Sequence, residues 1–127
     1  MTVKILLIED NEHVREELSE LLANSGYHVT TATNGLDGYS KVQQEHFDLC
    51  VVDHLMPLMN GVNFVKNLNT MDNGAPKAVI FLTTKDLAEV EPLFAPQLGF
   101  KILAKPICQQ LFLENVQQLV GQSCAVA

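Results

Sequence analysis

Short apolar segments recur along the chain, and each is followed by a stretch whose apolar residues have helical spacing. Continuous segments rich in Val, Ile and Leu are typical of strands buried on both faces. We expect strands over Val3–Ile8, His28–Thr31, Leu49–Val52, Ala78–Leu82 and Phe100–Leu103. We expect helices over Asn11–Asn24, Leu36–Gln44, Val62–Leu68, Leu87–Leu98 and Ile107–Val120. This alternation predicts an α/β protein with a parallel sheet that helices cover on both faces.

Size and charge narrow the possible functions. The 127 residues fit one domain, which we expect over residues 1–120 with a C-terminal tail over 121–127. The apolar segments are too short to span a bilayer and the N-terminus shows no signal-peptide pattern, so we expect a cytoplasmic protein without membrane contact. A net charge of −7, from 8 basic and 15 acidic residues, argues against direct binding of nucleic acid.

Polar residues follow four of the expected strands at the point where each strand ends. Glu9 and Asp10 come after the first strand, and Asp53 comes directly after the third. Thr83 follows the fourth strand, and Lys105 stands just beyond the fifth. Because the carboxyl ends of parallel strands lie at one edge of a sheet, where ligands bind, these five side chains should converge there.

This combination of groups favours phosphoryl chemistry. Three clustered carboxylates remain ionised together if a cation shares the site, and their hard oxygens suit Mg²⁺. A carboxylate can act as a nucleophile and form an aspartyl phosphate, while a metal and a lysine neutralise the transferred charge. Each residue alone has an ordinary interpretation, since Asp often caps helices and Lys is usually solvated. Phosphoryl chemistry is therefore predicted by the joint arrangement of these residues and not by any one of them.

The chain resembles the response-regulator receiver domains of two-component systems, of the kind found in chemotaxis regulators, over essentially its whole length from Val3 to Val120. The matching motifs are Ile8-Glu9-Asp10-Asn11, the run Asp53-His54-Leu55-Met56-Pro57-Leu58-Met59-Asn60-Gly61, Leu82-Thr83-Thr84 and Lys105-Pro106. The resemblance implies a flavodoxin-like, doubly wound sheet of five parallel strands in the order 2-1-3-4-5, with five helices.

The same resemblance implies roles for the residues at the strand ends. Asp53 would accept the phosphoryl group, Thr83 would contact it, and Lys105 would hold first a carboxylate and then a phosphoryl oxygen. The implied ligands of Mg²⁺ are Glu9, Asp10, Asp53 and the backbone carbonyl of Leu55. The implied phosphodonor is a phosphohistidine on a sensor histidine kinase or a histidine phosphotransfer protein, and the signal would pass to a downstream protein by contact.

The chain departs from the family pattern where receiver domains couple the site to their surface. Tyr or Phe usually stands three residues before the lysine, whereas this chain has Ile102, which lacks the reach and the polar tip of tyrosine. Pro92 and Pro96 fall within the expected helix Leu87–Leu98, and an internal proline removes a hydrogen bond and clashes with the preceding turn. We expect this helix to be broken or to start late, and the signal to leave mainly through the loop after Thr83 and the segment Asp86–Gln97.

Two other classes of function compete with the phosphorylated switch. A pseudo-receiver would bind partners without taking phosphate, but the intact acidic residues and lysine argue against it. A hydrolase with an aspartyl-phosphate intermediate usually needs an acid–base carboxylate two residues after the nucleophile, where this chain has Leu55. We therefore expect a signalling switch and not an enzyme. The sequence leaves open whether the chain is a stand-alone protein or part of a longer regulator.

Four smaller expectations concern single positions. Cys50 lies in an apolar run and should be buried. Leu111 lies off the apolar face of the last helix and should be exposed, either as a partner contact or as an ordinary surface leucine. His54 has no ligand spacing to another histidine, so we expect its position beside Asp53 to be incidental. The resemblance predicts a cis bond between Lys105 and Pro106.

Overall fold

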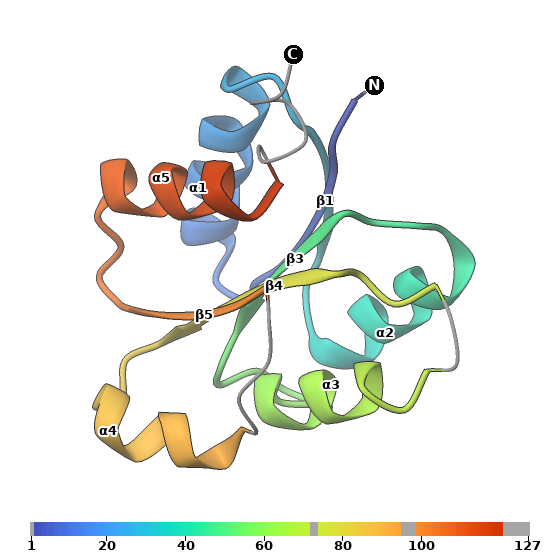
Figure 1. The fold of residues 1–127 in the computed structure, drawn as a ribbon, viewed down its shortest axis with the longest axis vertical. Helices are drawn as coiled ribbons and strands as arrows, with labels where there is room; N and C mark the ends of the chain where they lie inside the picture. The colour runs from blue at the N-terminus through green and yellow to red at the C-terminus, as the bar shows by residue number, and fades with distance from the viewer. Residues whose placement is uncertain (1, 72–73, 95–98, 121–127) are drawn as a thin grey trace.

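The computed structural model describes residues 2–71, 74–94 and 99–120 and contains one parallel sheet of five strands (Figure 1). The strands are β1 (Lys4–Ile8), β2 (His28–Ala32), β3 (Leu49–Asp53), β4 (Ala78–Thr83) and β5 (Phe100–Ala104). Their order in the sheet is β2-β1-β3-β4-β5. This confirms the expected doubly wound topology, and the expected strand limits agree with the structure to within one residue.

Five α-helices accompany the sheet within the described part of the chain. They are α1 (Glu12–Asn24), α2 (Gly35–Gln44), α3 (Gly61–Leu68), α4 (Leu87–Val90) and α5 (Gln109–Val120). Helices α1 and α5 lie on one face of the sheet, and α2, α3 and α4 lie on the other (Figure 1). Strands β1, β3 and β4 therefore lie in the interior, and nearly all of their side chains are buried.

Each face of the sheet has its own apolar core. Alternate residues of the strands point to opposite faces, so Leu7 packs under α1 and α5 while Ile8 packs under α2 and α3. We name the first side the α1/α5 face and the second the α3/α4 face. Cys50 is buried in the core of the α3/α4 face, as expected, and Leu111 is exposed on α5.

Asparagine side chains cap the first turns of three helices. Asn11, Asn34 and Asn60 accept hydrogen bonds from the backbone N–H of the residue three positions later, at 3.0, 2.7 and 2.9 Å. Such caps satisfy an N–H group that has no partner within the helix. They fix where the chain turns from the sheet into each helix, and thereby where the polar strand-end residues lie.

The expected helix over Leu87–Leu98 is shorter in the structure. Helix α4 ends at Val90 and continues as a 3₁₀ turn, η1 (Glu91–Leu93), with Pro92 near its start. Pro92 has no N–H to donate to the preceding turn, which explains why regular helical bonding stops there. Phe94 then adopts an extended conformation, and residues 95–98, including Pro96, lie outside the described part of the chain.

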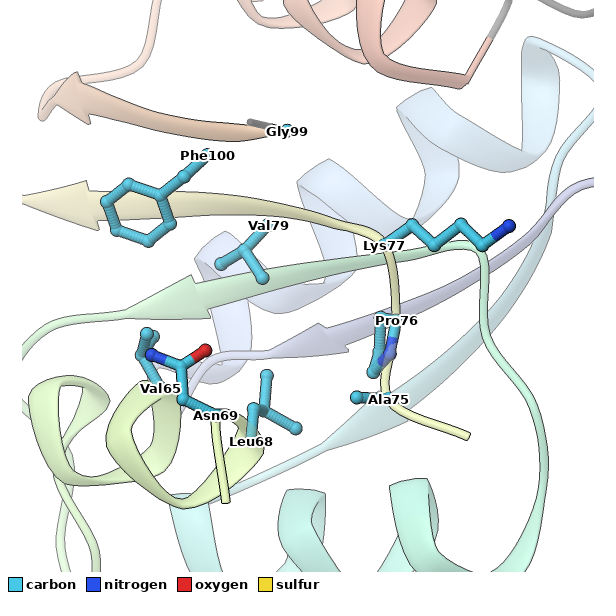
Figure 2. A pocket seen from close by; sticks show the side chains of 9 residues that line it. All are labelled: Val65, Leu68, Asn69, Ala75, Pro76, Lys77, Val79, Gly99 and Phe100. Atoms are coloured by element: carbon cyan, nitrogen blue, oxygen red, sulfur yellow. The ribbon is translucent and has the colours of Figure 1, made fainter. Parts of the chain in front are cut away.

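A cavity of about 50 Å³ lies between α3 and the amino-terminal ends of β4 and β5, away from the polar strand ends (Figure 2). Val65 and Leu68 of α3, Val79 of β4 and Phe100 of β5 contribute to its lining. It is much smaller than typical small-molecule sites, which measure about 300 Å³ or more. Within the described residues, no helix has the length and apolar character that crossing a membrane requires. The expected tail over 121–127 lies outside those residues.

Candidate functional site

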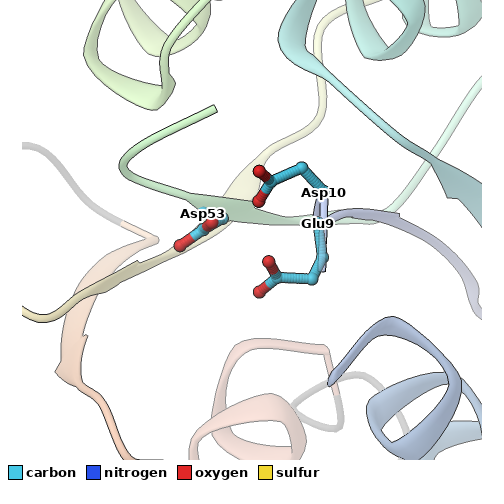
Figure 3. Close-up of side chains that lie close together, drawn as sticks. All are labelled: Glu9, Asp10 and Asp53. Atoms are coloured by element: carbon cyan, nitrogen blue, oxygen red, sulfur yellow. The ribbon is translucent and has the colours of Figure 1, made fainter. Parts of the chain in front are cut away.

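Three carboxyl groups meet at the carboxyl ends of β1 and β3. Glu9 and Asp10 follow β1, Asp53 is the last residue of β3, and one oxygen from each lies within 4.8 Å of the others (Figure 3). Glu9 and Asp53 are buried, whereas Asp10 is exposed to solvent. The sequence predicted this convergence because parallel strands end at one edge of the sheet.

Lys105 joins two of these carboxylates from the end of β5. Its Nζ donates to Oε1 of Glu9 and to Oδ1 of Asp53, both at 3.0 Å. Its backbone N–H donates to the carbonyl oxygen of Thr83 at 2.8 Å, which ties the turn after β5 to β4. The Lys105–Pro106 bond is cis, as the resemblance predicted. One ammonium group thus compensates two buried negative charges.

The charges of the site are strongly perturbed by burial. Burial raises the pKa of Glu9 to about 7, with the charge of Asp53 adding to the shift and the hydrogen bond from Lys105 opposing it. Burial also raises the pKa of Asp53, again against the effect of Lys105. Burial alone would lower the pKa of Lys105, but its bonds to Asp53 and Glu9 outweigh burial and raise that pKa. The site therefore favours an added positive charge near the two carboxylates.

Thr83 lies at the same edge, but its hydroxyl has partners other than the carboxylates. Oγ1 of Thr83 lies 2.8 Å from Nδ1 of His54 and accepts the backbone N–H of Lys85 at 3.0 Å. The side chain of Thr83 is fully buried. His54 thus contacts a residue of the predicted site, which the sequence did not lead us to expect.

The contact between His54 and Thr83 follows from strand register. Strands β3 and β4 pair Asp53 with Leu82, so the next residues on the two strands lie side by side. Sequence reasoning missed this contact because it looked for metal-ligand spacing among histidines. No pattern in the sequence fixes the register of β3 against β4, so the sequence held no signal for this contact.

The loop after Asp53 depends on the glycine at its end. The N–H of Gly61 donates to the carbonyl oxygen of His54 at 2.8 Å, which brings the loop back beside β3. A Cβ atom on Gly61 would clash with the backbone oxygen of Asp53, so this approach needs glycine. Leu58 adopts φ of 69° near the tip of the loop. The metal-ligand role of the Leu55 carbonyl stays a prediction, and the Leu55 side chain is 54% exposed.

Ile102 occupies the position where the family usually has an aromatic switch residue. It is partly buried and packs, with Phe100, against the core of the α3/α4 face, so the two residues share one side of β5 as expected. The aromatic residues on this face instead form a row in which Phe81 is buried and the other rings are partly buried. Ring centroids are 5.1 Å apart for His54 and Phe81, 4.9 Å for Phe81 and Phe94, and 4.8 Å for Phe94 and Phe100.

Doubly wound α/β proteins bind their ligands at the carboxyl edge of the sheet. In this chain that edge carries an acidic cluster and a lysine. The model of the response regulator receiver domain matches residues 5–117. The chain therefore belongs to the response-regulator receiver family and is a receiver domain of two-component signalling.

Individual relatives agree with this assignment. The chain is 28% identical to the response regulator receiver protein CpdR of Brucella abortus, over 92% of this chain and 96% of CpdR. It is 30% identical to the transcriptional regulatory protein CusR of Escherichia coli, over 98% of this chain but 54% of CusR. The chain thus spans nearly all of one relative and about half of the other.

Solved structures confirm the fold. The chemotaxis response regulator CheY4 of Vibrio cholerae superimposes with a TM-score of 0.85 and is 28% identical, covering 94% of this chain and 99% of CheY4. The similarity extends across both faces of the sheet, because almost the whole of each chain is included.

Proposed function

We propose that Asp53 is the phosphoacceptor of this receiver domain. The observation that carries the proposal is the arrangement around its carboxylate, which lies at the end of β3 with Lys105 at 3.0 Å and two further carboxyl groups beside it. An oxygen of Asp53 would attack the phosphorus of a phosphohistidine. The new bond is O–P, the broken bond is P–N, and the electron pair returns to the histidine nitrogen of the donor.

The donor set fits a magnesium ion. Glu9, Asp10 and Asp53 offer hard carboxylate oxygens within 4.8 Å of one another, and we propose the Leu55 carbonyl as a further ligand. A bound Mg²⁺ would supply positive charge to the phosphoryl oxygens in this site. Lys105 would exchange a carboxylate partner for a phosphoryl oxygen, and Thr83 would donate its hydroxyl proton to another.

The partners follow from the same chemistry. The donor would be a sensor histidine kinase or a histidine phosphotransfer protein, and the phosphorylated domain would act on a downstream protein by contact. A cytoplasmic location, where such a donor and free Mg²⁺ are available, belongs to this proposal. The net charge of −7 gives no support for direct contact with nucleic acid.

Intact mass tests the phosphoacceptor. Incubation with acetyl phosphate and Mg²⁺ should add the mass of one phosphoryl group to the wild-type protein and none to Asp53→Asn. Asp86→Asn is the matched control, because asparagine can keep the cap that Asp86 provides to α4 through Ala88 N–H. Full modification of Asp53→Asn would disprove the assignment, and an unmodified wild type would favour a pseudo-receiver.

Titration with Mg²⁺ tests the metal site. Asp10→Asn should raise the dissociation constant several-fold, because it removes both an oxygen ligand and a negative charge. Glu12→Gln removes one charge from the exposed first turn of α1 and serves as the control. Equal binding by Asp10→Asn and the wild type would place the metal elsewhere.

A further inference from the structure

The hydroxyl of Thr83 has one proton, and its surroundings decide where that proton points. Lys85 N–H already donates to Oγ1, so this contact uses a lone pair and not the proton. Among the described residues, Nδ1 of His54, at 2.8 Å, is the acceptor placed to receive it. Because Thr83 is fully buried, a hydroxyl proton without an acceptor would cost free energy.

The state of the imidazole agrees with this direction. Nδ1 is the ring nitrogen that lies against Oγ1 of Thr83, at 2.8 Å. A neutral imidazole has one acceptor nitrogen and one donor nitrogen. The tautomer with the proton on Nε2 lets Nδ1 accept from Thr83 and leaves both groups satisfied.

The same imidazole ring contacts the aromatic row on the α3/α4 face. His54 is tilted against Phe81, whose ring meets Phe94 edge to face. Phe94 directly follows η1, in the segment that we expect to carry the signal. Ile102 has no polar group with which to contact the Thr83 hydroxyl, whereas His54 already does so. The side chain that contacts the Thr83 hydroxyl is therefore His54, and not the residue at the usual switch position, Ile102.

We propose that His54 is a positioning residue of the switch, which binds the Thr83 hydroxyl proton in the unphosphorylated protein and releases it when Thr83 turns to a phosphoryl group. The proposal rests on Asp53 being the phosphoacceptor. A phosphoryl oxygen and Nδ1 of His54 compete for one proton, so the hydrogen bond favours the unphosphorylated state. Loss of this hydrogen bond frees the His54 ring, which packs against Phe81.

Two substitutions separate the effect of the hydrogen bond from the effect of the aromatic ring. His54→Phe keeps an aromatic ring against Phe81 and removes the acceptor. His54→Asn removes the ring and keeps an acceptor close to the position of Nδ1. His46→Phe, at an exposed histidine that pairs with Asp48, is the matched control.

The measurement is the affinity for beryllofluoride, a phosphoryl mimic, at fixed Mg²⁺, followed by amide chemical shifts. His54→Phe should bind roughly three- to tenfold more tightly than the wild type, the effect of removing one competing neutral hydrogen bond. His54→Asn and His46→Phe should stay within about twofold of the wild type. In a Thr83→Val background, His54→Phe should have no effect, because the contested proton is absent.

Nitrogen chemical shifts of the His54 ring provide a readout that a purely structural role would not change. The free protein should show an unprotonated, hydrogen-bonded Nδ1, and beryllofluoride should change its shift. A proton on Nδ1 in the free protein would overturn the proposal, as would unchanged affinity in His54→Phe while the wild type binds the mimic. If the wild type does not bind beryllofluoride at all, the phosphoacceptor assignment fails and this inference fails with it.

Discussion

The two faces of the sheet end in different chemistry at the carboxyl edge. By strand alternation, Glu9 and Asp53 belong to the α1/α5 face, where Lys105 bridges them at 3.0 Å. Thr83 follows Phe81 by two residues and belongs to the α3/α4 face, where its hydroxyl meets His54. One face carries the ion pairs of Lys105 with Glu9 and Asp53, and the other carries a neutral hydrogen bond and a row of aromatic rings.

The two faces of the sheet differ in how closely they follow the family pattern. The charged face has carboxylates and a lysine where the resemblance requires them, and the proposed phosphoryl transfer would need such fixed oxygens and a fixed positive charge. The α3/α4 face differs from the pattern at Ile102 and at the helix interrupted by Pro92, and it carries the contact between His54 and Thr83. Coupling to a partner can be built from several packing arrangements, so this face can vary while the chemistry stays the same.

The largest expected effect comes from matched core substitutions on the two faces. Phe81→Ala and Phe112→Ala remove equally buried rings, and each should lower the free energy of unfolding by about 3–5 kcal/mol. Phe81→Ala should also shift the His54 ring resonances, because it removes the ring that packs against His54. Urea unfolding and imidazole spectra measure both effects. An equal change at His54 in Phe112→Ala would show that the faces do not act separately.

Removing the ammonium group tests the charged face. Lys105→Met leaves two buried carboxylates without their counter-charge, and it should lower the free energy of unfolding by about 3 kcal/mol at pH 8 without divalent cations. The loss should be smaller at pH 5, where the carboxyl groups take up protons. Lys101→Met, on the exposed side of β5, should change stability by less than about 0.5 kcal/mol. Equal free energies of unfolding for Lys105→Met and Lys101→Met at pH 8 would show that Lys105 does not stabilise the buried carboxylates.

A smaller effect concerns the pH dependence of stability. The pKa of Glu9 rises from its ordinary value of 4.5 to about 7 in the folded protein. Between these values the folded state holds a proton that the unfolded chain has lost, so stability falls as pH rises through the window. Asp53 contributes with the same sign because its pKa is also raised. Urea unfolding of the metal-free protein should show a flatter profile in Glu9→Gln than in Glu12→Gln.

A free energy of unfolding that rises with pH would contradict the effect of burial that we expect at Glu9. If metal-free stability rose between pH 5 and about 7, the carboxylates would be stabilised in their ionised form by the folded protein. The hydrogen bonds from Lys105 would then outweigh burial at Glu9, and the site would have less need of a further cation.

The sequence by itself determined the framework and the charged part of the site. Alternating apolar segments specified five strands, and the continuous apolar character of β1, β3 and β4 agrees with their burial on both faces of the sheet. The positions of Asp10, Asp53 and Lys105 at or near strand ends determined their convergence, because parallel strands share one carboxyl edge. The sequence also showed the interruption at Pro92, since proline cannot donate a helical hydrogen bond.

The tertiary structure alone decided which partners the neutral groups have. His54 reads as incidental in the sequence, and its contact with Thr83 depends on the register of β3 against β4, which no local pattern encodes. The row from Phe81 to Phe94 likewise joins residues of a strand and of the segment after η1. Strand ends fix where a residue lies along the sheet, whereas register and side-chain packing across strands fix what it touches.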